Sequence, residues 1–296
     1  MGYVSPGRLY LEKQKTVETY EDVLAYAEFL RAEAGLDGVL PVDLQKILTH
    51  FQIPEPEPVP LPQQQGLLLD SERGIILINS KDPLKRQKFT TAHELVEMLF
   101  AELPQGKDLG RGWWINKPGG FKEGAKEAIC NWTAANLLMP IDYVKKEIKT
   151  YGVTFECARH VADTCDVSLT SALVQIARTS MSGYFVVLWK LKHKPADLAK
   201  KKAEENQMTL FRLENTEPPK KLRVEWCLNN KNAIFLPKHK STEKDSFIHE
   251  SWERNIFTQG RVNISLDGRN TTWFYSENMS VFIEDERCVI SLMRKI

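Results

Sequence analysis

Residues 89–100 read Phe-Thr-Thr-Ala-His-Glu-Leu-Val-Glu-Met-Leu-Phe, and this stretch decides how the rest of the chain is interpreted. Apolar residues flank the charged ones at helical spacing, which predicts a buried helix over 85–101. In a helix, side chains four residues apart share a face, so His93 and Glu97 can hold one metal ion from adjacent turns. Glu94 is placed to take a proton from a metal-bound water. A buried His-Glu-x-x-Glu needs a charge partner, which a divalent cation supplies.

A catalytic metal site that keeps an open position needs a third protein ligand. The candidate is Glu127, in a second predicted helix over 122–139 that ends before Pro140. This helix is otherwise mostly apolar, so a carboxylate on its inner face would be costly to bury without a partner. Glu123, one turn earlier, stands among lysines and glycine, and we interpret it as solvated.

Trp113 and Trp114 lie in the loop over 105–121 that joins the two predicted metal helices. One interpretation is that they cap the hydrophobic core. The other is that they form a wall of a substrate groove, because exposed aromatic side chains favour peptide partners. The sequence leaves both interpretations open, and the second makes the pair candidate substrate-binding residues.

The segments before this region predict two helices and a hairpin. An amphipathic helix is predicted over 16–34, and a shorter one opens at 41–44. Five prolines in residues 54–62 exclude a helix and disfavour a central strand, so an extended connector is predicted. Residues 66–70 and 74–79 are apolar and partly β-branched, which predicts a β-hairpin.

Further helices are predicted over 141–150 and 155–181, the latter with a helix–turn–helix-like break at 167–171. The second half of that segment offers Gln175 and Arg178 but little other basic character. Affinity for DNA depends mainly on Lys and Arg contacts to phosphate. A structural helical hairpin is therefore favoured over a DNA-reading element.

The character of the chain changes near residue 182. Residues 184–189 are typical of a strand, and about 210–296 consists of short β-rich segments with turn signals. We therefore predict two domains, 1–181 and 182–296, of which the second is smaller, β-rich and suited to sensing a signal or selecting a substrate. The lysines between 190 and 202 are interpreted as a solvated face, with DNA or an acidic partner as the alternative.

The composition is that of an ordinary globular protein, with 42% hydrophobic and 27% charged residues in a chain of 296. A net charge of +1 gives no global attraction to nucleic acid or to an acidic membrane. The five cysteines are odd in number and lack a CxxC spacing, so reduced thiols are predicted. No signal-peptide pattern opens the chain, and no stretch has the about 18 apolar residues of a membrane span, so a cytoplasmic location is predicted.

A second His-Glu-x-x-Glu occurs at 249–253. It lacks the Phe-Thr-x-Ala that precedes the first one, and no apolar helix carrying a glutamate follows it. Its neighbours in the chain are polar. We therefore interpret it as a solvated helix face and not as a ligand site.

Several motifs together resemble the ImmA/IrrE family of bacterial regulatory proteases. The matching parts are Ile-Leu-Ile-Asn at 76–79, Arg-Gln-Lys-Phe-Thr-Thr-Ala-His-Glu at 86–94, then Glu127, Asn131, Ala134 and Leu-Leu-Met-Pro at 137–140. The likeness covers roughly residues 16–180. Cys130 and Thr133 depart from the family motif, and we interpret them as packing changes.

This resemblance implies an α+β fold with a zincin-like metallopeptidase core and a helical extension, followed by the β-rich C-terminal domain. It implies that His93 and Glu127 bind zinc or manganese and that Glu94 is the catalytic base. The family has a second histidine where this chain has Glu97. A glutamate can still ligate there, but its oxygen moves the preference from zinc toward manganese or magnesium. Its negative charge also means that the metal lowers the pKa of a bound water less than it would with a second histidine.

Proteases of this family cut helix–turn–helix transcriptional repressors of the XRE type, often under stress or in mobile elements. The resemblance therefore implies a site-specific endopeptidase that uses one divalent metal ion to cut such a repressor. Two alternatives stay open. One is a catalytically degenerate relative that binds a partner protein without cutting it, and the other is a DNA-binding regulator that uses 155–181. No membrane partner is expected.

Overall fold

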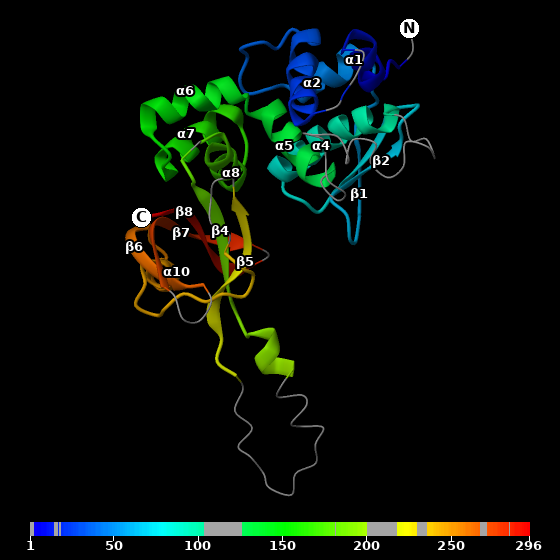
Figure 1. Ribbon diagram of the computed structural model, residues 1–296. Helices are drawn as coiled ribbons and strands as arrows, with labels where there is room; N and C mark the ends of the chain where they lie inside the picture. The colour runs from blue at the N-terminus through cyan, green and yellow to red at the C-terminus, as the bar shows by residue number, and fades with distance from the viewer. Residues whose placement is uncertain are drawn as a thin grey trace, which may run out of the picture. The chain divides into compact units, whose positions relative to one another are not determined.

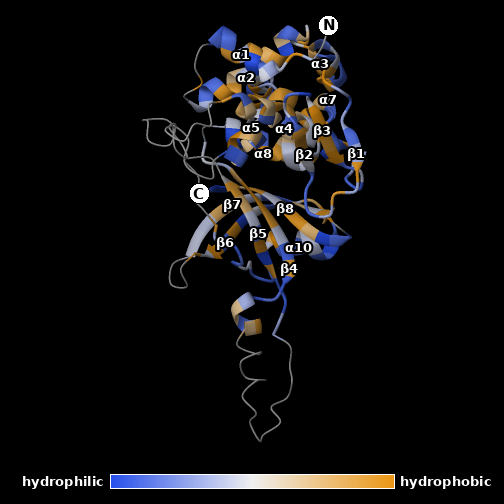
Figure 2. Cartoon of the chain, turned by 90° about the vertical axis from the view of Figure 1, so that its right-hand side faces the viewer, coloured by the Kyte–Doolittle hydropathy of each residue, from blue (hydrophilic) through white to orange (hydrophobic). Residues whose placement is uncertain are grey.

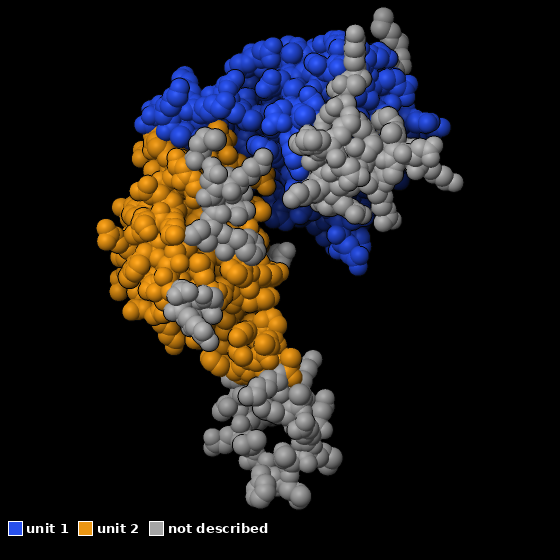
Figure 3. Space-filling model, viewed as in Figure 1, with its two compact units in different colours: residues 1–150, 158–175 blue, residues 151–157, 176–296 orange. Residues whose placement is uncertain are grey.

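The structure is a computed structural model, and it describes residues 3–14, 17, 19–103, 126–180, 182–199, 218–229, 236–266, 271–283 and 285–296. The chain divides into two compact units, one of Met1–Thr150 with Ala158–Gln175 and the other of Tyr151–Cys157 with Ile176–Ile296 (Figure 3). The first unit has helices and a small sheet, and the second has a five-stranded antiparallel sheet. The predicted α+β class is confirmed, whereas the domain boundary near 182 stays a prediction.

The helical region extends from α1 to α8 (Figure 1). Its helices are α1 (Pro6–Gln14), α2 (Tyr20–Glu33), α3 (Leu44–Phe51), α4 (Leu84–Glu102), α5 (Lys126–Leu138), α6 (Ile141–Tyr151), α7 (Phe155–Cys165) and α8 (Leu169–Thr179). A capping box opens α2, because Thr19 and Asp22 each accept a hydrogen bond from the other's backbone N–H. The first three helices carry both hydrophilic and hydrophobic residues, as surface helices do (Figure 2).

The small sheet has the strand order β1-β3-β2, with β1 (Glu57–Val59), β2 (Gly66–Asp70) and β3 (Ile75–Asn79). β2 and β3 are the predicted hairpin and pair antiparallel. β1 comes from the proline-rich connector and pairs in parallel with β3. A proline is tolerated there because an edge strand leaves one side without ladder hydrogen bonds. The opposite edge is β2, and both strands of the hairpin pack against α4.

α4 is buried along most of its length, as its apolar flanks predicted. α1, α5 and the hairpin pack around it. Its fully buried side chains include Ala92, Leu95, Val96 and Leu99. α1 comes so close that a Cβ on Gly7 would lie 2.5 Å from the carbonyl oxygen of Met98. Burying four such side chains contributes several kcal/mol to folding, at about 1.5–3 kcal/mol for each large one.

The C-terminal end of α5 is held by a buried cation. Arg31, on α2, donates from Nη1 to the carbonyl oxygens of Asn136 and Leu137, at 2.7 and 3.3 Å. These are among the last carbonyl groups of the helix, which have no partner within it and favour a positive charge nearby. α2 therefore fixes one end of the helix that carries Glu127.

The predicted break between two helices is confirmed and lies between Cys165 and Leu169. Lys88 donates to the carbonyl oxygen of Asp166 at 3.3 Å and pairs with its carboxylate at 3.1 Å, which ties this turn to α4. Gln175 is fully buried and donates to the Met139 carbonyl oxygen at 3.2 Å. It is not available to read bases, so the structure favours the structural hairpin.

The second unit is a sheet in the order β5-β4-β8-β7-β6. Its strands are β4 (Phe185–Lys192), β5 (Lys221–Asn229), β6 (Thr258–Ser265), β7 (Thr271–Ile283) and β8 (Glu286–Lys295), and α10 (Phe247–Arg254) packs on β6, β7 and β8. The core contains Trp189, whose Nε1 donates to Ser291 Oγ at 3.0 Å, and Ile248 from α10. All five cysteines of the chain are free thiols. Among the described residues, no helix has the length and apolar character to cross a membrane.

Candidate metal centre

α4 presents His93, Glu94 and Glu97 in the middle of the buried helix. His93 Nε2 lies 3.7 Å from Glu97 Oε1, and each of these two side chains keeps 15% of its surface exposed. The one-turn spacing therefore brings an imidazole nitrogen and a carboxylate together, as the sequence predicted. Both face a site that solvent can still reach.

α5 brings Glu127 to the same histidine. Its Oε2 lies 3.7 Å from His93 Nε2. Glu127 therefore approaches the histidine from α5, whereas Glu97 lies on α4 together with the histidine. The expectation that this carboxylate is buried is wrong, because 71% of its side-chain surface is exposed. Glu127 sits in the first turn of α5, where the helix emerges into solvent. Its proximity to His93, and not the cost of burial, is what makes it a candidate ligand.

Asn131 contacts the other nitrogen of the histidine. Its Oδ1 lies 3.2 Å from His93 Nδ1. When Nδ1 carries the hydrogen and donates to this oxygen, Nε2 keeps its lone pair and points at the two carboxylates. Sequence reasoning noted Asn131 only as a match to a family motif. Its position four residues after Glu127, on the same helix face, was the signal for this role.

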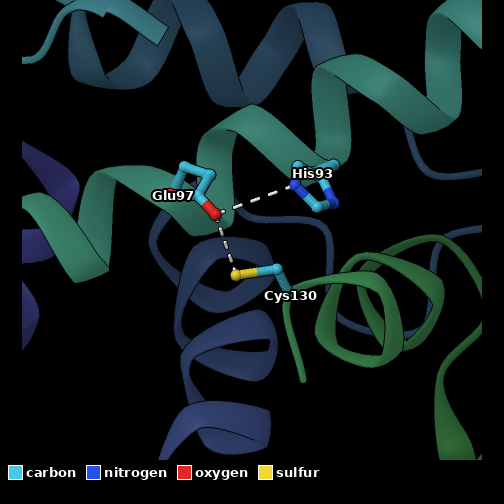
Figure 4. A group of neighbouring side chains, drawn as sticks. All are labelled: His93, Glu97 and Cys130. Atoms are coloured by element: carbon cyan, nitrogen blue, oxygen red, sulfur yellow. Dashed lines mark hydrogen bonds and ion pairs between the residues drawn. The ribbon is translucent and has the colours of Figure 1, made fainter. Parts of the chain in front are cut away.

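Two further side chains of α5 contact Glu97, and the sequence predicted neither contact. Cys130 Sγ donates to Glu97 Oε1 at 3.2 Å, and the Lys126 ammonium pairs with Glu97 Oε2. Figure 4 shows His93 and Cys130 meeting the same oxygen of the Glu97 carboxylate. Burial, and then the charge of Glu97, raises the pKa of the Cys130 thiol well above its ordinary range. Cys130 is therefore a protonated donor here, beyond the packing role expected of it.

Glu94 is the most buried acid of the group, with 6% of its surface exposed. Burial raises its pKa to about 7, and the charge of Glu97 adds to this, while a hydrogen bond from the Leu68 backbone lowers it. A carboxylate that titrates near neutrality can both accept and return a proton. Gly66 allows β2 to lie this close, because a Cβ there would be 2.3 Å from Thr90 Cγ2 and 2.9 Å from Glu94 Oε1.

A cavity of about 260 Å³ opens beside these groups. It is lined from β2, α4 and α5 by residues that include Gly66, Phe89, His93, Glu94, Glu127 and Asn131. Trp113 and Trp114 lie outside the described residues, so their place as groove walls stays a prediction. The cavity gives a substrate group access to the base and the histidine together.

The distances from His93 Nε2 to the two carboxylates suit ligands of one divalent metal ion. Ligand atoms at 2.0–2.2 Å from a tetrahedral ion lie about 3.4 Å apart, close to the 3.7 Å that separates His93 Nε2 from each carboxylate oxygen. One nitrogen and two oxygens suit zinc or manganese. Within the described part of the chain, the potential ligand atoms that all lie within 4.8 Å of one another belong to His93, Glu97 and Cys130, and Glu127 is outside this group. A metal bound by Glu97 competes with Lys126 and Cys130 for the oxygens of this carboxylate.

Comparison with known proteins agrees with this geometry. The sequence profile of the IrrE N-terminal-like domain matches residues 56–175, the part that contains α4, α5 and the small sheet. These residues form an IrrE N-terminal-like domain. The radiation response metalloprotease IrrE of Deinococcus deserti is 36% identical over 119 residues, which are 40% of this chain and 41% of that protein. The IrrE of Deinococcus radiodurans is 33% identical over 115 residues, which are 39% of this chain and 34% of that protein.

The predicted resemblance is thus confirmed for the IrrE N-terminal-like domain, and the aligned part spans less than half the length of these metalloproteases. A solved structure, a transcriptional regulator from Mycobacterium tuberculosis, resembles the chain with a TM-score of 0.55. It is 8% identical, over 98% of this chain and 92% of that one. At this identity the likeness concerns the fold alone.

The second His-Glu-x-x-Glu lies outside the IrrE N-terminal-like domain, on α10. His249 Nδ1 is 3.3 Å from Glu253 Oε1, and the ring meets Trp252 edge-on at 5.9 Å. The prediction of a solvated face is wrong for His249, which is 8% exposed, because α10 packs this side on the sheet. Glu250 pairs with Arg254 at 2.8 Å. Among the described residues, no third metal-binding group joins this pair.

Proposed function

We propose that this chain is a metal-dependent, site-specific endopeptidase. His93, Glu97 and Glu127 hold one divalent ion, zinc or manganese, and Glu94 is the general base. The observation that carries the proposal is the meeting of α4 and α5 at His93, with a buried, near-neutral carboxylate beside it at the wall of a cavity. Similarity to two radiation response metalloproteases over this domain supports it.

Each residue of the site has a defined task in this proposal. When bound, the ion would polarise the peptide carbonyl and favour deprotonation of water. Glu94 accepts the proton from the attacking water and returns it to the leaving amine, for which a pKa of about 7 is suited. Asn131 holds the His93 ring by Nδ1, so that Nε2 faces the metal position.

The edge strand β2 is suited to holding the substrate. It lies at the end of the small sheet, and Gly66 at its start lines the cavity. An extended peptide can add to such an edge through backbone hydrogen bonds. A flexible or unfolded segment of a protein, and not a folded helix, is the form of substrate that this geometry accepts.

The proposed substrate is a helix–turn–helix repressor of the XRE type, cut in a response to stress or to a mobile element. This step rests on the family resemblance of residues 56–175 and on the radiation response named for the relatives. The second unit would then select the target or receive a signal. A cytoplasmic location belongs to the same proposal.

A specific observation favours one alternative, a degenerate peptidase that binds a partner without cutting it. The Lys126 ammonium and the Cys130 thiol both contact Glu97. A partly buried carboxylate needs a charge partner, and an internal ammonium group supplies one. A DNA-binding role for α7 and α8 has less support, since Gln175 is buried.

Metal analysis of the purified protein tests the proposal against this alternative. We expect one zinc or manganese per chain in the wild type and loss of that metal in His93→Ala and Glu127→Ala. Glu127→Ala should keep the thermal midpoint of the metal-free wild type, because 71% of this side chain is exposed. His93→Ala should lower the midpoint slightly, because only 15% of the histidine side chain is exposed. Absence of bound metal in the wild type after dialysis against either ion would reject the peptidase and leave the degenerate relative.

A further inference from the structure

The second unit contains a strongly basic cavity that the proposed peptidase does not use. Its volume is about 660 Å³, and it lies where the start of β5, the end of β6 and the segment 236–244 meet. Among the described residues of its lining, six carry cationic side chains: Lys194, Lys221, Arg223, Lys238, Lys240 and Lys244. Glu243 is the one acidic residue among the same described residues. We call this the basic cavity.

The positive charge of the basic cavity is mostly uncompensated. Lys238 shares Glu225 with Lys192. Among the described residues, the other lysines of the lining form no ion pair with a carboxylate, whereas many exposed lysines elsewhere do. Lys221 stands directly opposite Lys192 in the β4–β5 register, and like charges in that position repel each other. An anion bound in the basic cavity would offset the positive charge of the lysines that have no carboxylate partner among the described residues.

Arg223 gives the basic cavity a rigid floor. It is 6% exposed, and its guanidinium donates to the carbonyl oxygens of Lys192 and His239, at 3.3 and 3.1 Å. His239 has a φ of 71°, a left-handed conformation that a histidine adopts only when its surroundings hold it there. A guanidinium has five N–H donors in a fixed plane, which matches the oxygens of a phosphate. The cation at the base of the cavity is therefore held in place before any ligand binds.

A buried polar atom that has no hydrogen-bond partner among the described residues belongs to the lining of the basic cavity. Asn263 lines the basic cavity, and its side-chain oxygen is buried with no hydrogen-bond partner in the described chain. Ser265 and Ser241 add hydroxyl groups to the same wall. A ligand that has hydroxyl or amino groups as well as phosphate would satisfy the amide of Asn263. Inorganic phosphate alone would leave it unpaired.

The dimensions select the class of ligand. Pockets of about 300–1,000 Å³ are typical for small molecules and cofactors, and 660 Å³ fits a nucleotide. A nucleic acid strand needs a groove that continues along the surface and usually has aromatic side chains on which bases stack. Among the described residues that line the basic cavity, none is Phe, Tyr or Trp.

We propose that the basic cavity binds a phosphorylated small molecule of nucleotide size. Lys221, Lys240 and Lys244 hold its phosphate groups above Arg223, and Asn263 binds a hydroxyl or amino group of the remainder. This gives the second unit a ligand of defined chemistry. The binding does not depend on the peptidase activity proposed for the first unit.

The test is a calorimetric titration of the full chain with two probes, inorganic tripolyphosphate and adenosine triphosphate. The protein is treated with a chelator first, because both probes also bind metal ions. The variant Lys221→Gln/Lys240→Gln/Lys244→Gln is compared with Lys46→Gln/Lys149→Gln/Lys295→Gln, which removes three exposed lysines from other surfaces. We expect at least a tenfold loss of affinity for both probes in the first triple variant and less than twofold in the second.

Asn263→Ala separates the two probes. It should weaken the binding of adenosine triphosphate at least threefold and leave the affinity for tripolyphosphate unchanged. Only the nucleotide has hydroxyl and amino groups that this amide can bind. If the triple variant fails to fold, the exposed Lys244→Gln alone should lower both affinities by several-fold. The proposal is overturned by no binding of either probe at millimolar concentration, by equal losses in the two triple variants, or by a single-stranded oligonucleotide that binds more tightly than adenosine triphosphate.

Discussion

The chain contains the same His-Glu-x-x-Glu twice, on α4 and on α10, and the two copies differ in almost everything except their helical geometry. Each places its histidine within 3.7 Å of the glutamate one turn later. On α4 the neighbouring helix adds Glu127 and Asn131 to the histidine. On α10 the neighbours are the side chain of Trp252 and a largely apolar sheet. A motif of five residues therefore gives a pair of ligands, and the partner element decides whether they become a site.

The glutamate directly after each histidine, Glu94 on α4 and Glu250 on α10, shows the same contrast. Glu94 is buried beside β2 and has its pKa raised to about 7. Glu250 is paired with Arg254 at the surface of α10. A general base needs both a pKa near neutrality and a cavity for substrate, and the described residues provide these at Glu94. Variants made in parallel at the two motifs can break or sharpen this comparison.

The largest effect is expected from substitution of Glu94, with Glu250 as its matched control. Glu94→Gln should lower kcat/KM for cleavage of an XRE-type repressor by about 10³-fold, the scale of a lost general base, while bound metal is retained. Glu250→Gln should leave kcat/KM unchanged. Cleavage products are counted by mass spectrometry with the purified repressor as substrate. Equal activity of Glu94→Gln and the wild type would remove Glu94 from the mechanism.

Next in size is the loss of metal on truncation of the two histidines. His93→Ala should bind no stoichiometric metal, since the imidazole is the contact shared by both carboxylates. His249→Ala should keep full metal content but lose about 1–2 kcal/mol of unfolding free energy, because a buried, packed ring is removed. Metal is measured by elemental analysis and stability by urea unfolding. Half the metal missing in His249→Ala would show that α10 is a second site.

A smaller effect is expected for the residue that orients His93. Asn131→Ala removes the partner of Nδ1 and should weaken metal binding about 10–100-fold, as losses of such supporting contacts do. Asn131→Asp, which keeps an acceptor at this position, should restore most of the affinity. The dissociation constant is obtained by competition with a chromophoric chelator. If Asn131→Ala bound metal as tightly as the wild type, the ring would have to be held by other contacts.

The smallest effect concerns the cation that competes for Glu97. Lys126→Met should strengthen metal binding about fivefold, because the ion no longer competes with an ammonium group worth about 1 kcal/mol. The matched change Arg254→Met frees Glu250 on α10 and should create no metal site. Both are followed by the same chelator competition. Weaker binding in Lys126→Met would mean that the lysine supports the site instead of competing with it.

Much of the fold was predictable from local patterns. The helix of residues 85–101, the hairpin and the break near residue 167 follow from spacing and turn residues, and each was found within a few positions. β1 was predicted only as an extended connector, since its pairing with β3 depends on a contact about 20 residues away. The sequence of a proline-rich segment taken by itself does not show the three residue pairs that make β1 an edge strand.

For the candidate site, the sequence by itself determined that His93, Glu94 and Glu97 share one helix and that Glu127 lies on another, because helical spacing is a property of the backbone. Only the tertiary structure decided how exposed Glu127 is, that Asn131 meets His93, that Lys126 and Cys130 meet Glu97, and that His249 is buried. Burial and pairing depend on which surfaces two distant segments turn toward each other. That is set by the packing of the whole core, and no local pattern records it.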